Sequence, residues 1–242
     1  MIIDTIVDLI FPLRCPVCDR PVPFKKRDWG ICPECVNKLN YVKGFVCTRC
    51  GRPMYTGAKE ELLCDQCIKR KGRFSCDRGF SLCIYDDVMR KLIYRFKYAG
   101  RREYGDALGH LMGRRYKKMI ERAGVDGIVP VPLHEKRFKK RGYNQSELLA
   151  KGISEICDVP YYPDYVLRVK NTAPMKTLSG KMRQNNLKKA FKIGQNDVKL
   201  KKVVVVDDIY TTGSTVEAVA HVLKEAGVKK VYFLTLSTGD GK

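Results

Sequence analysis

Residues 203–215 carry groups that could bind a sugar phosphate. Four valines run into two carboxylates, Asp207 and Asp208, which precede a turn rich in small residues and hydroxyls. Carboxylates accept hydrogen bonds from adjacent sugar hydroxyls, and they hold Mg²⁺ directly or through water. The turn can surround a phosphate with backbone N–H groups, hydroxyls and the positive end of a helix dipole. Its members are Thr211, Thr212, Gly213, Ser214 and Thr215.

These groups require a strand, a turn and a helix in direct succession. The four valines at 203–206 are typical of a buried strand in a parallel sheet. Segment 214–226 repeats apolar residues at helical spacing and stops at Gly227, so it predicts the helix that follows the turn. Each residue alone also fits an ordinary strand end or helix cap. Their full order in one segment favours a binding site.

The segment resembles the signature with which type I phosphoribosyltransferases bind 5-phosphoribosyl 1-pyrophosphate (PRPP). That signature places two acidic residues between a hydrophobic strand and a Thr-Thr-Gly-Ser/Thr loop. The resemblance implies that Asp207 and Asp208 contact the ribose hydroxyls of PRPP, which binds with Mg²⁺, and that residues 211–215 hold its 5′-phosphate. A nucleotide P-loop is a different pattern, because it contains Gly-Lys-Ser/Thr.

Eight of the eleven cysteines form four C-x-x-C pairs. Adding 32 to the residue numbers of the first two pairs gives the second two, so the region is an internal duplication. The spacing C-x₂-C-x₁₃-C-x₂-C is that of a zinc ribbon, in which two pairs of thiolates complete a tetrahedral site. We therefore expect two structural zinc ions, with the ligands paired in sequence order. The first set is Cys15, Cys18, Cys32 and Cys35, and the second is Cys47, Cys50, Cys64 and Cys67.

Disulfide bonding and redox chemistry are the alternatives for these cysteines. A lysine-rich chain that shows no signal peptide argues against disulfides. Four evenly spaced pairs argue against a single reactive dithiol. A cross-braced pairing of the same eight cysteines stays open at this point.

A boundary near residue 75 divides the chain into two predicted parts. Residues 1–75 comprise an N-terminal helix and the double zinc ribbon, and residues 76–242 alternate strands with helices. That alternation predicts a mainly parallel α/β sheet whose ligand crevice lies beyond the carboxyl ends of its strands. The expected strands are 80–85, 127–132, 203–206 and 229–236, and the expected helices are 88–98, 101–122, 144–157 and 214–226.

The strand at 127–132 runs into a loop with five cations within six positions. A solvated basic loop is the plain interpretation. The neighbouring phosphate and ribose site favours a second role, because a type I phosphoribosyltransferase binds pyrophosphate with the loop after its first core strand. The residues expected to form this loop are Val131, Pro132, Leu133, His134, Lys136 and Arg137.

The charge of the chain points to polyanions as partners. Lys and Arg number 47 against 26 Asp and Glu, which gives a formal net charge of +21. Single-stranded DNA fits such a surface, with bases stacking on Tyr94, Tyr98 or Tyr143. The cations expected to contact it are Arg90, Lys91, Lys97, Arg137, Lys139, Lys140, Arg141, Lys176, Lys181 and Arg183.

No stretch reaches the roughly 18 apolar residues of a membrane-spanning helix. The apolar run at 2–13 lacks a basic leading region, so we do not expect a signal peptide. We expect it to form an amphipathic helix that docks on the protein, with contact to a membrane surface as the alternative. The expected location is the cytoplasm, with peripheral contact at the inner face of the membrane left open.

Several motifs in one order resemble the late-competence ComF (ComFC) family over nearly the whole chain. The resemblance implies a zinc-ribbon head joined to a phosphoribosyltransferase-like domain that handles incoming single-stranded DNA on the cytoplasmic side. It also implies helicase-like and membrane-channel components of the uptake machinery as partners. The motifs are the C-x-x-C pairs, Tyr-Arg-Phe-Lys-Tyr at 94–98, Val-Pro-Val-Pro-Leu-His at 129–134, Arg-Gly-Tyr-Asn-Gln at 141–145, segment 176–186, and Asp-Asp-Ile-Tyr-Thr-Thr-Gly at 207–213.

Two functions follow from these patterns. One is a DNA-handling protein that keeps a PRPP-binding site, and the other is an active transferase for an unidentified base or nucleotide. The overall charge favours the first, because a small-molecule enzyme gains little from a globally basic surface. A zinc-ribbon scaffold that recruits a protein partner is compatible with either. The sequence assigns no catalytic residue and no oligomeric state.

Overall fold

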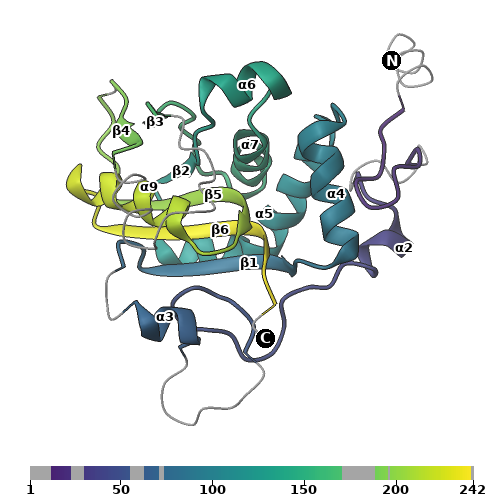
Figure 1. Ribbon diagram of the computed structural model, residues 1–242, viewed down its shortest axis with the longest axis horizontal. Helices are drawn as coiled ribbons and strands as arrows, with labels where there is room; N and C mark the ends of the chain where they lie inside the picture. The colour runs from purple at the N-terminus through teal and green to yellow at the C-terminus, as the bar shows by residue number, and fades with distance from the viewer. Residues whose placement is uncertain are drawn as a thin grey trace, which may run out of the picture.

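A parallel four-stranded sheet forms the centre of the protein (Figure 1). The computed structural model describes residues 12–22, 30–54, 63–70, 74–170, 189–195 and 197–240. The strands lie in the order β1-β6-β5-β2 and every neighbouring pair is parallel. Their bounds are Arg78–Ile84 for β1, Gly127–Pro130 for β2, Lys202–Tyr210 for β5 and Lys230–Thr238 for β6. The predicted α/β fold with a parallel sheet is confirmed.

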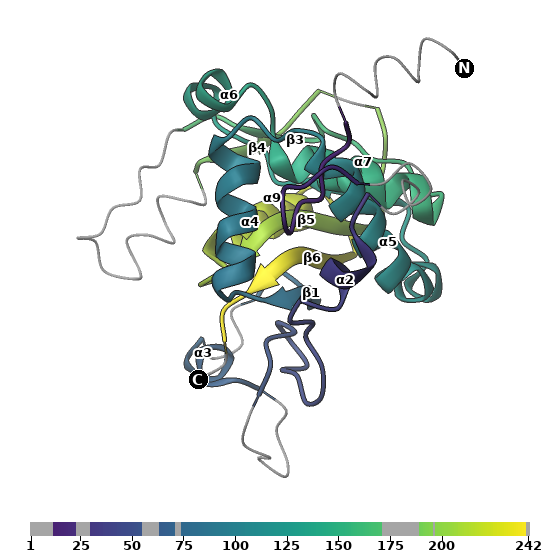
Figure 2. The ribbon, with the colours of Figure 1, turned by 90° about the vertical axis from the view of Figure 1, so that its right-hand side faces the viewer.

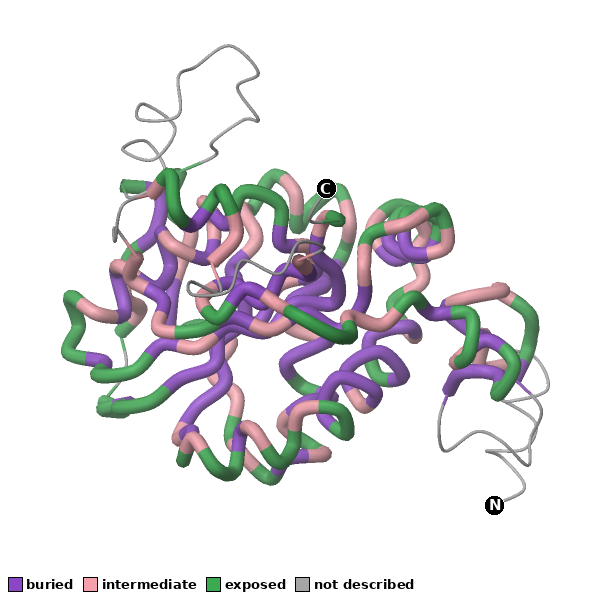
Figure 3. Tube along the Cα trace, turned by 90° about the horizontal axis from the view of Figure 1, so that it is seen from below, coloured by how far each residue is buried: buried purple, intermediate pink, exposed green. Residues whose placement is uncertain are grey.

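The sheet is buried on both faces, which explains the valine run in β5. Val204 and Val206 pack on one face, and Val203 and Val205 on the other. All four side chains are fully buried, as expected for a central parallel strand. The buried stretches run through the middle of the molecule in Figure 3.

Helices cover both faces of the sheet. On one face lie α4 (Asp87–Tyr98), α5 (Tyr104–Ala123) and α7 (Gln145–Cys157), and on the other lies α9 (Ser214–Glu225) (Figures 1 and 2). These four helices match the predicted ones to within a few residues at each end. Their apolar stripes pack into the two cores together with residues of the strands.

Two short features within residues 76–242 were not predicted. The first is the antiparallel hairpin of β3 (Val166–Arg168) and β4 (Phe191–Ile193). The second is α6 (Glu135–Arg141), a helix in the segment expected to be a basic loop. Lys139 pairs with Glu135 one turn earlier at 2.6 Å, and His134 caps the first turn. These contacts supply local support for a helix within the cationic run.

The cysteine-rich region has two units, the first around Cys15, Cys18, Cys32 and Cys35 and the second around Cys47, Cys50, Cys64 and Cys67. The two units pack against opposite faces of the sheet. The first contains α2 (Pro33–Val36) and joins the core of α4 and α5. The second contains α3 (Asp65–Lys69) and joins the core of α9. Figures 1 and 2 show α3 below β1 and apart from α2.

One sequence-based prediction concerns residues that the structure does not describe. The expected N-terminal helix at 2–13 falls almost wholly outside the described residues, which begin at residue 12. Among the helices that the structure describes, none is long and apolar enough to cross a membrane.

Candidate functional site

A cavity of about 250 Å³ opens at the carboxyl ends of β2 and β5. Parallel α/β sheets bind ligands at this edge. The cavity brings together the acidic pair, part of the turn before α9, the segment after β2 and the start of α7. Its lining residues are Lys97, Val131, Pro132, Leu133, Arg137, Arg141, Asn144, Gln145, Ser146, Arg168, Asp207, Asp208, Ile209, Thr211 and Thr215.

The acidic pair is held in place by bonds from three sources. The Ser146 hydroxyl donates to Asp207 Oδ1 at 3.0 Å, and the backbone N–H of Asp208 donates to the same oxygen at 2.9 Å. The Lys97 ammonium forms an ion pair with Asp208 Oδ2. Lys97 was expected to lie on a solvent-facing surface for nucleic acid, but its side chain is only 17% exposed and reaches into this cavity. Contact between Lys97 and nucleic acid stays a prediction.

Asp207 has an unusual proton affinity. Burial and the neighbouring Asp208 carboxylate raise the pKa of Asp207 to about 7, while Lys97, the Asp208 amide and Ser146 oppose this rise. Two carboxylates this close resist carrying two full negative charges. A divalent cation or additional hydrogen-bond donors would relieve that repulsion.

The turn before α9 adopts a conformation that requires glycine. Gly213 is the N-cap residue with φ 72° and ψ 5°, in the left-handed region. A Cβ atom at this position would lie 2.5 Å from the Tyr210 hydroxyl oxygen. Within the turn, the Thr212 and Ser214 hydroxyls lie 2.9 Å apart. The first N–H groups of a twelve-residue helix therefore face an open turn lined by hydroxyls.

The second cysteine-rich unit supports this turn directly, which the sequence did not reveal. Arg52 Nη2 donates to the carbonyl oxygen of Thr211 at 2.5 Å, and Arg70 Nη2 donates to that of Thr212. The backbone N–H of Ser75 also donates to Glu217 in the first turn of α9, at 2.7 Å. A separation of 159 residues between Arg52 and Thr211 hides this contact from any local pattern.

The segment after β2 is shaped by the residues before α7. Asn144 Nδ2 donates to the carbonyl oxygen of Val131 at 3.1 Å, while the Asn144 carboxamide oxygen caps α7. Four of the six residues expected in this segment line the cavity, whereas His134 caps α6 and Lys136 is exposed. Asn144, Gln145 and Ser146 line the cavity without having been predicted. The first two belong to the Arg-Gly-Tyr-Asn-Gln motif, and Ser146 follows it.

The structure separates the cations that were expected to contact nucleic acid. Arg90 pairs with Asp87, and Lys91 is exposed on α4. Arg137 and Arg141 line the cavity, and Lys140 and Arg141 line a second one described below. Lys176, Lys181 and Arg183 lie outside the described residues.

The prediction that Tyr143 stacks on bases is wrong. Tyr143 is 7% exposed and its hydroxyl donates to the carbonyl oxygen of Phe96 at 2.6 Å, so it is a core residue. Tyr94 and Tyr98 are 63% and 55% exposed. Only these two keep ring surface available to a ligand.

The cysteines form two four-cysteine sites of the zinc-ribbon type. Within each set the four sulfur atoms lie within 4.8 Å of one another, and the pairing follows sequence order as predicted. The Cys18 and Cys32 sulfurs are 3.9 Å apart, and those of Cys50 and Cys64 are 3.6 Å apart. A tetrahedron with Zn–S bonds of about 2.3 Å places its sulfur atoms roughly 3.8 Å apart. Both sets therefore have the dimensions of a zinc site, and the cross-braced pairing is wrong.

The first cysteine-rich unit is fastened to α4 and α5 by side chains from both helices. Arg95 Nη2 donates to the carbonyl oxygens of Pro16 and Val17 at 3.0 and 2.8 Å. The Tyr104 hydroxyl donates to Asp19 Oδ1 at 2.5 Å. This unit thus contacts the face of the sheet opposite the one that the second unit covers.

Comparison with known proteins matches both parts of the chain. A family model described as a double zinc ribbon domain covers residues 6–68, and one described as a phosphoribosyl transferase domain covers residues 145–241. The purine phosphoribosyltransferase of Pyrococcus horikoshii, a solved structure, is 19% identical with a TM-score of 0.37 over 54% of this chain and 73% of its own.

Three curated relatives extend over most of the chain. Competence protein F of Haemophilus influenzae is 32% identical, over 91% of this chain and 95% of its own length. DNA utilization protein YhgH of Escherichia coli is 31% identical, over 92% and 96%. Competence protein ComFC of Bacillus subtilis is 29% identical, over 90% and 91%. The chain belongs to the ComF family of competence proteins, with a double zinc ribbon and a phosphoribosyltransferase domain.

Proposed function

We propose that the protein binds PRPP with Mg²⁺ in the cavity at the ends of β2 and β5. The observation that supports this most is the convergence of three parts on one cavity: the acidic pair, the turn before α9 and the segment after β2. In this proposal Asp207 and Asp208 accept hydrogen bonds from the ribose hydroxyls. The turn at 211–215 holds the 5′-phosphate, and Arg137 contacts the pyrophosphate.

The residues present fit a magnesium ion bound together with PRPP. Oxygen ligands suit Mg²⁺, which is held in proteins by one or two carboxylates together with substrate phosphates. Asp207 and Asp208 supply the carboxylates, and the Lys97 ammonium leaves the trio with a negative charge when both acids are ionised. The metal would neutralise pyrophosphate charge, and Lys97 would stay beside Asp208.

The wider role we propose is the handling of incoming single-stranded DNA at the cytoplasmic side of an uptake machinery. The net charge of +21 supports it, because a polyanion-binding surface needs cations beyond one phosphate site. The relatives named for competence and DNA utilization support the same role. Helicase-like and channel components of that machinery are the partners we propose, at the inner face of the membrane.

Phosphoribosyl transfer is the second candidate. A separate cavity shares Lys97 and Arg141 with the proposed PRPP site, so an acceptor could lie next to the ribose. Transfer would release pyrophosphate from PRPP when an oligonucleotide or nucleotide is added. Absence of any PRPP-dependent pyrophosphate release across these acceptors would count against this candidate and leave the binding proposal intact.

The PRPP proposal is tested with Asp207→Asn combined with Asp208→Asn. A ligand that binds only the folded protein raises its melting temperature, so PRPP with Mg²⁺ should stabilise the wild type and leave the double variant unchanged. The matched control is Asp87→Asn with Asp106→Asn, which removes the same charge from two exposed acids outside the cavity. Equal stabilisation of both double variants by PRPP would contradict the proposed site.

A further inference from the structure

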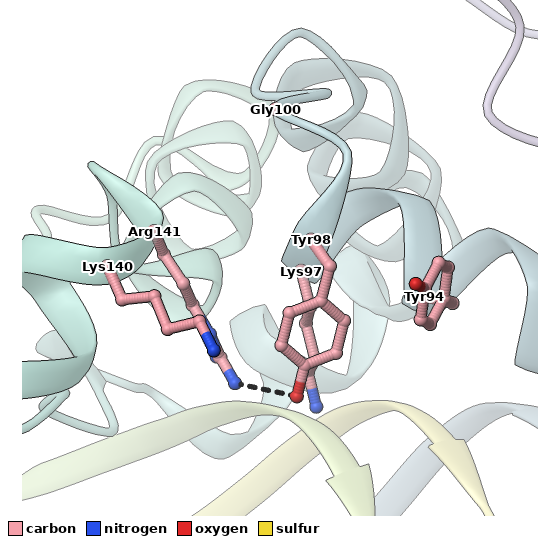
Figure 4. A pocket seen from close by; sticks show the side chains of 6 residues that line it. All are labelled: Tyr94, Lys97, Tyr98, Gly100, Lys140 and Arg141. Atoms are coloured by element: carbon pink, nitrogen blue, oxygen red, sulfur yellow. Dashed lines mark hydrogen bonds between the residues drawn. The ribbon is translucent and has the colours of Figure 1, made fainter.

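A second cavity lies between the end of α4 and the end of α6 (Figure 4). Its volume is about 440 Å³, within the range of roughly 300–1,000 Å³ that is usual for small-ligand pockets. Two tyrosines and three cations dominate its wall. We call it the tyrosine pocket, and its lining residues are Tyr94, Lys97, Tyr98, Gly100, Lys140 and Arg141.

The aromatic side of the tyrosine pocket is exposed to solvent. Tyr94 and Tyr98 lie one helical turn apart on α4, with ring centroids 5.3 Å apart and planes tilted by 49°. They are 63% and 55% exposed, among the most exposed large hydrophobic side chains in the part of the chain described. Neighbouring aromatic rings left open in this way offer stacking surface to a flat ring from a ligand.

The cationic side faces the same rings. The Arg141 guanidinium lies 5.1 Å from the Tyr98 ring centroid, and Arg141 Nη2 lies 3.3 Å from the Tyr98 hydroxyl oxygen. Figure 4 shows Lys140 and Arg141 reaching toward Tyr98, with Lys97 behind it. None of the six lining residues carries a negative charge. The pocket therefore combines ring surface with anion-binding groups.

We propose that the tyrosine pocket binds one nucleotide of a single DNA strand. Its base stacks on Tyr98 or Tyr94, and its phosphate contacts Lys140 and Arg141. Aromatic side chains beside a basic track are the arrangement with which proteins hold single strands, since every base has a ring face. A base in a duplex is already stacked and paired, so the pocket selects single strands. This inference rests on the proposed DNA function and adds to it the place where a nucleotide is held.

The tyrosine pocket adjoins the proposed PRPP site. Lys97 and Arg141 line both cavities, and the Lys97 ammonium contacts Asp208. A nucleotide in the pocket would thus lie next to the ribose of PRPP. Tyr98 and Lys140 line only the tyrosine pocket, so variants at these positions separate the two sites.

The first test measures the affinity of an unstructured, fluorescently labelled oligonucleotide by anisotropy. Tyr98→Ala should weaken binding roughly 5- to 100-fold, the range that stacking of one base provides, while Tyr98→Phe keeps the ring and most of the affinity. Tyr85→Ala is the matched control, because Tyr85 is also exposed but lies before α4 and outside the pocket. Unchanged affinity in Tyr98→Ala and in Tyr94→Ala would overturn the inference and point to a protein partner on this surface.

The second test compares two lysines on the same helix. Lys140 lines the pocket, whereas Lys139 pairs with Glu135 and does not line it. Lys140→Gln should weaken binding and reduce the log–log dependence on salt by about 0.7 for the one lost phosphate contact on a single strand. Lys139→Gln should change both quantities less. If the two variants lose the same affinity for the oligonucleotide, the overall positive charge attracts the strand. That result would overturn the proposal that the strand binds in the tyrosine pocket.

The third test locates the base and separates this inference from the PRPP proposal. An oligonucleotide carrying 5-iodouracil, photo-crosslinked to the full chain, should attach to Tyr94 or Tyr98 in peptide mapping by mass spectrometry. Attachment elsewhere would overturn the assignment. Thermal stabilisation by PRPP should persist in Tyr98→Ala. If PRPP fails to stabilise the wild type, the PRPP proposal is wrong, whereas loss of the crosslink alone removes only the tyrosine pocket.

Discussion

At the scale of single residues, the turn between β5 and α9 depends on a position that has no room for a side chain. Gly213 has a positive φ and lies against the Tyr210 hydroxyl. Tyr210 in turn stacks on Phe233, with ring centroids 4.8 Å apart. A methyl group at 213 would therefore push on a ring that the core holds in place.

We expect Gly213→Ala to destabilise the protein and to weaken PRPP binding. A left-handed backbone costs about 1–2 kcal/mol for a residue with a Cβ, and displacement of Tyr210 adds to this. Gly227→Ala is the control, since Gly227 has φ 91° but its Cβ would meet nothing within 4 Å. Urea unfolding and PRPP titration of both variants check this. Equal losses of stability, with PRPP affinity unchanged in each, would show that contact with Tyr210 does not matter.

A second residue-scale prediction concerns Asp77, just before β1. Its carboxylate accepts hydrogen bonds from Lys224, Lys230 and the amide of Val231 at 2.7–2.9 Å. Burial alone would raise the pKa of Asp77, but these bonds outweigh it and lower the pKa below 3.8. The stabilisation is therefore present above pH 4 and is lost as pH falls through the lowered pKa.

Asp77→Asn should reduce the free energy of unfolding at pH 7 by about 1–3 kcal/mol. The difference between wild type and variant should shrink as the pH falls below 3.8, because the carboxylate is then protonated in the unfolded chain and, once the pH passes the lowered pKa, in the folded protein too. Comparison of the two proteins at each pH cancels the loss of zinc that acid causes in both. A difference that stays constant over this range would contradict the role given to the charge.

Sequence reasoning succeeded for residues that act beside their neighbours in the chain. Asp207 and Thr211 belong to one strand and turn, so a local pattern predicted that they come together. Ser146 and Lys97 reach the same carboxylates from other helices, and the bond from Ser146 spans 61 residues. Lys97 also sits in a basic helix face that looks solvated from its periodicity alone.

At the scale of elements, the second cysteine-rich unit acts as a support for the turn before α9. Arg52 and Arg70 bind the carbonyl oxygens of Thr211 and Thr212, which fixes two peptide groups of the turn. Arg52 is itself buried, at 8% exposed. Its position is thus set by the fold of the unit around it.

We expect Arg52→Ala to weaken PRPP binding while both cysteine sites keep their metal. Removal of the guanidinium frees the Thr211 carbonyl and leaves the turn less ordered before the ligand arrives, which lowers affinity. Arg49→Ala is the control from the same unit, because the Arg49 guanidinium packs over the Phe74 ring at 4.6 Å. The measurements are PRPP titration and zinc content. If both variants bind PRPP with wild-type affinity, the bond from Arg52 to the turn does not contribute to PRPP binding.

The elements that sequence reasoning missed are short. β3 and β4 have three residues each and pair with each other across more than twenty residues, so neither has a pattern long enough to recognise. α6 carries five Lys and Arg among seven residues and buries none of them, so it has no apolar stripe to signal a helix. The four long helices have such stripes and were predicted.

At the scale of the whole molecule, the cysteine-rich region holds both faces of the sheet. The duplication predicted two similar units, but only the structure shows that one packs on α4 and α5 and the other on α9. A repeat in sequence does not say which surface each copy meets. The proposed division of the chain near residue 75 stays a prediction.

We expect two zinc ions per chain, and different consequences when each site is removed. Cys64→Ser with Cys67→Ser should leave one zinc and weaken PRPP binding, because the second unit supports the turn. Cys32→Ser with Cys35→Ser should also leave one zinc but affect PRPP less, since the first unit contacts α4 and α5. Metal analysis and PRPP titration decide this. Two remaining zincs in either variant would contradict the ligand sets.

The segment between the two cysteine-rich units runs along β1, the outer strand of the sheet. The Val42 amide donates to Leu82 at 3.0 Å, and the Ile84 amide donates to Asn40 at 2.8 Å. An uncovered outer strand invites pairing with another chain and aggregation. Here some of the outward-facing backbone N–H and C=O groups of β1 already bond to the protein's own backbone. Before β1 could pair with a strand of a second molecule, the segment between the two cysteine-rich units would have to break its hydrogen bonds to β1.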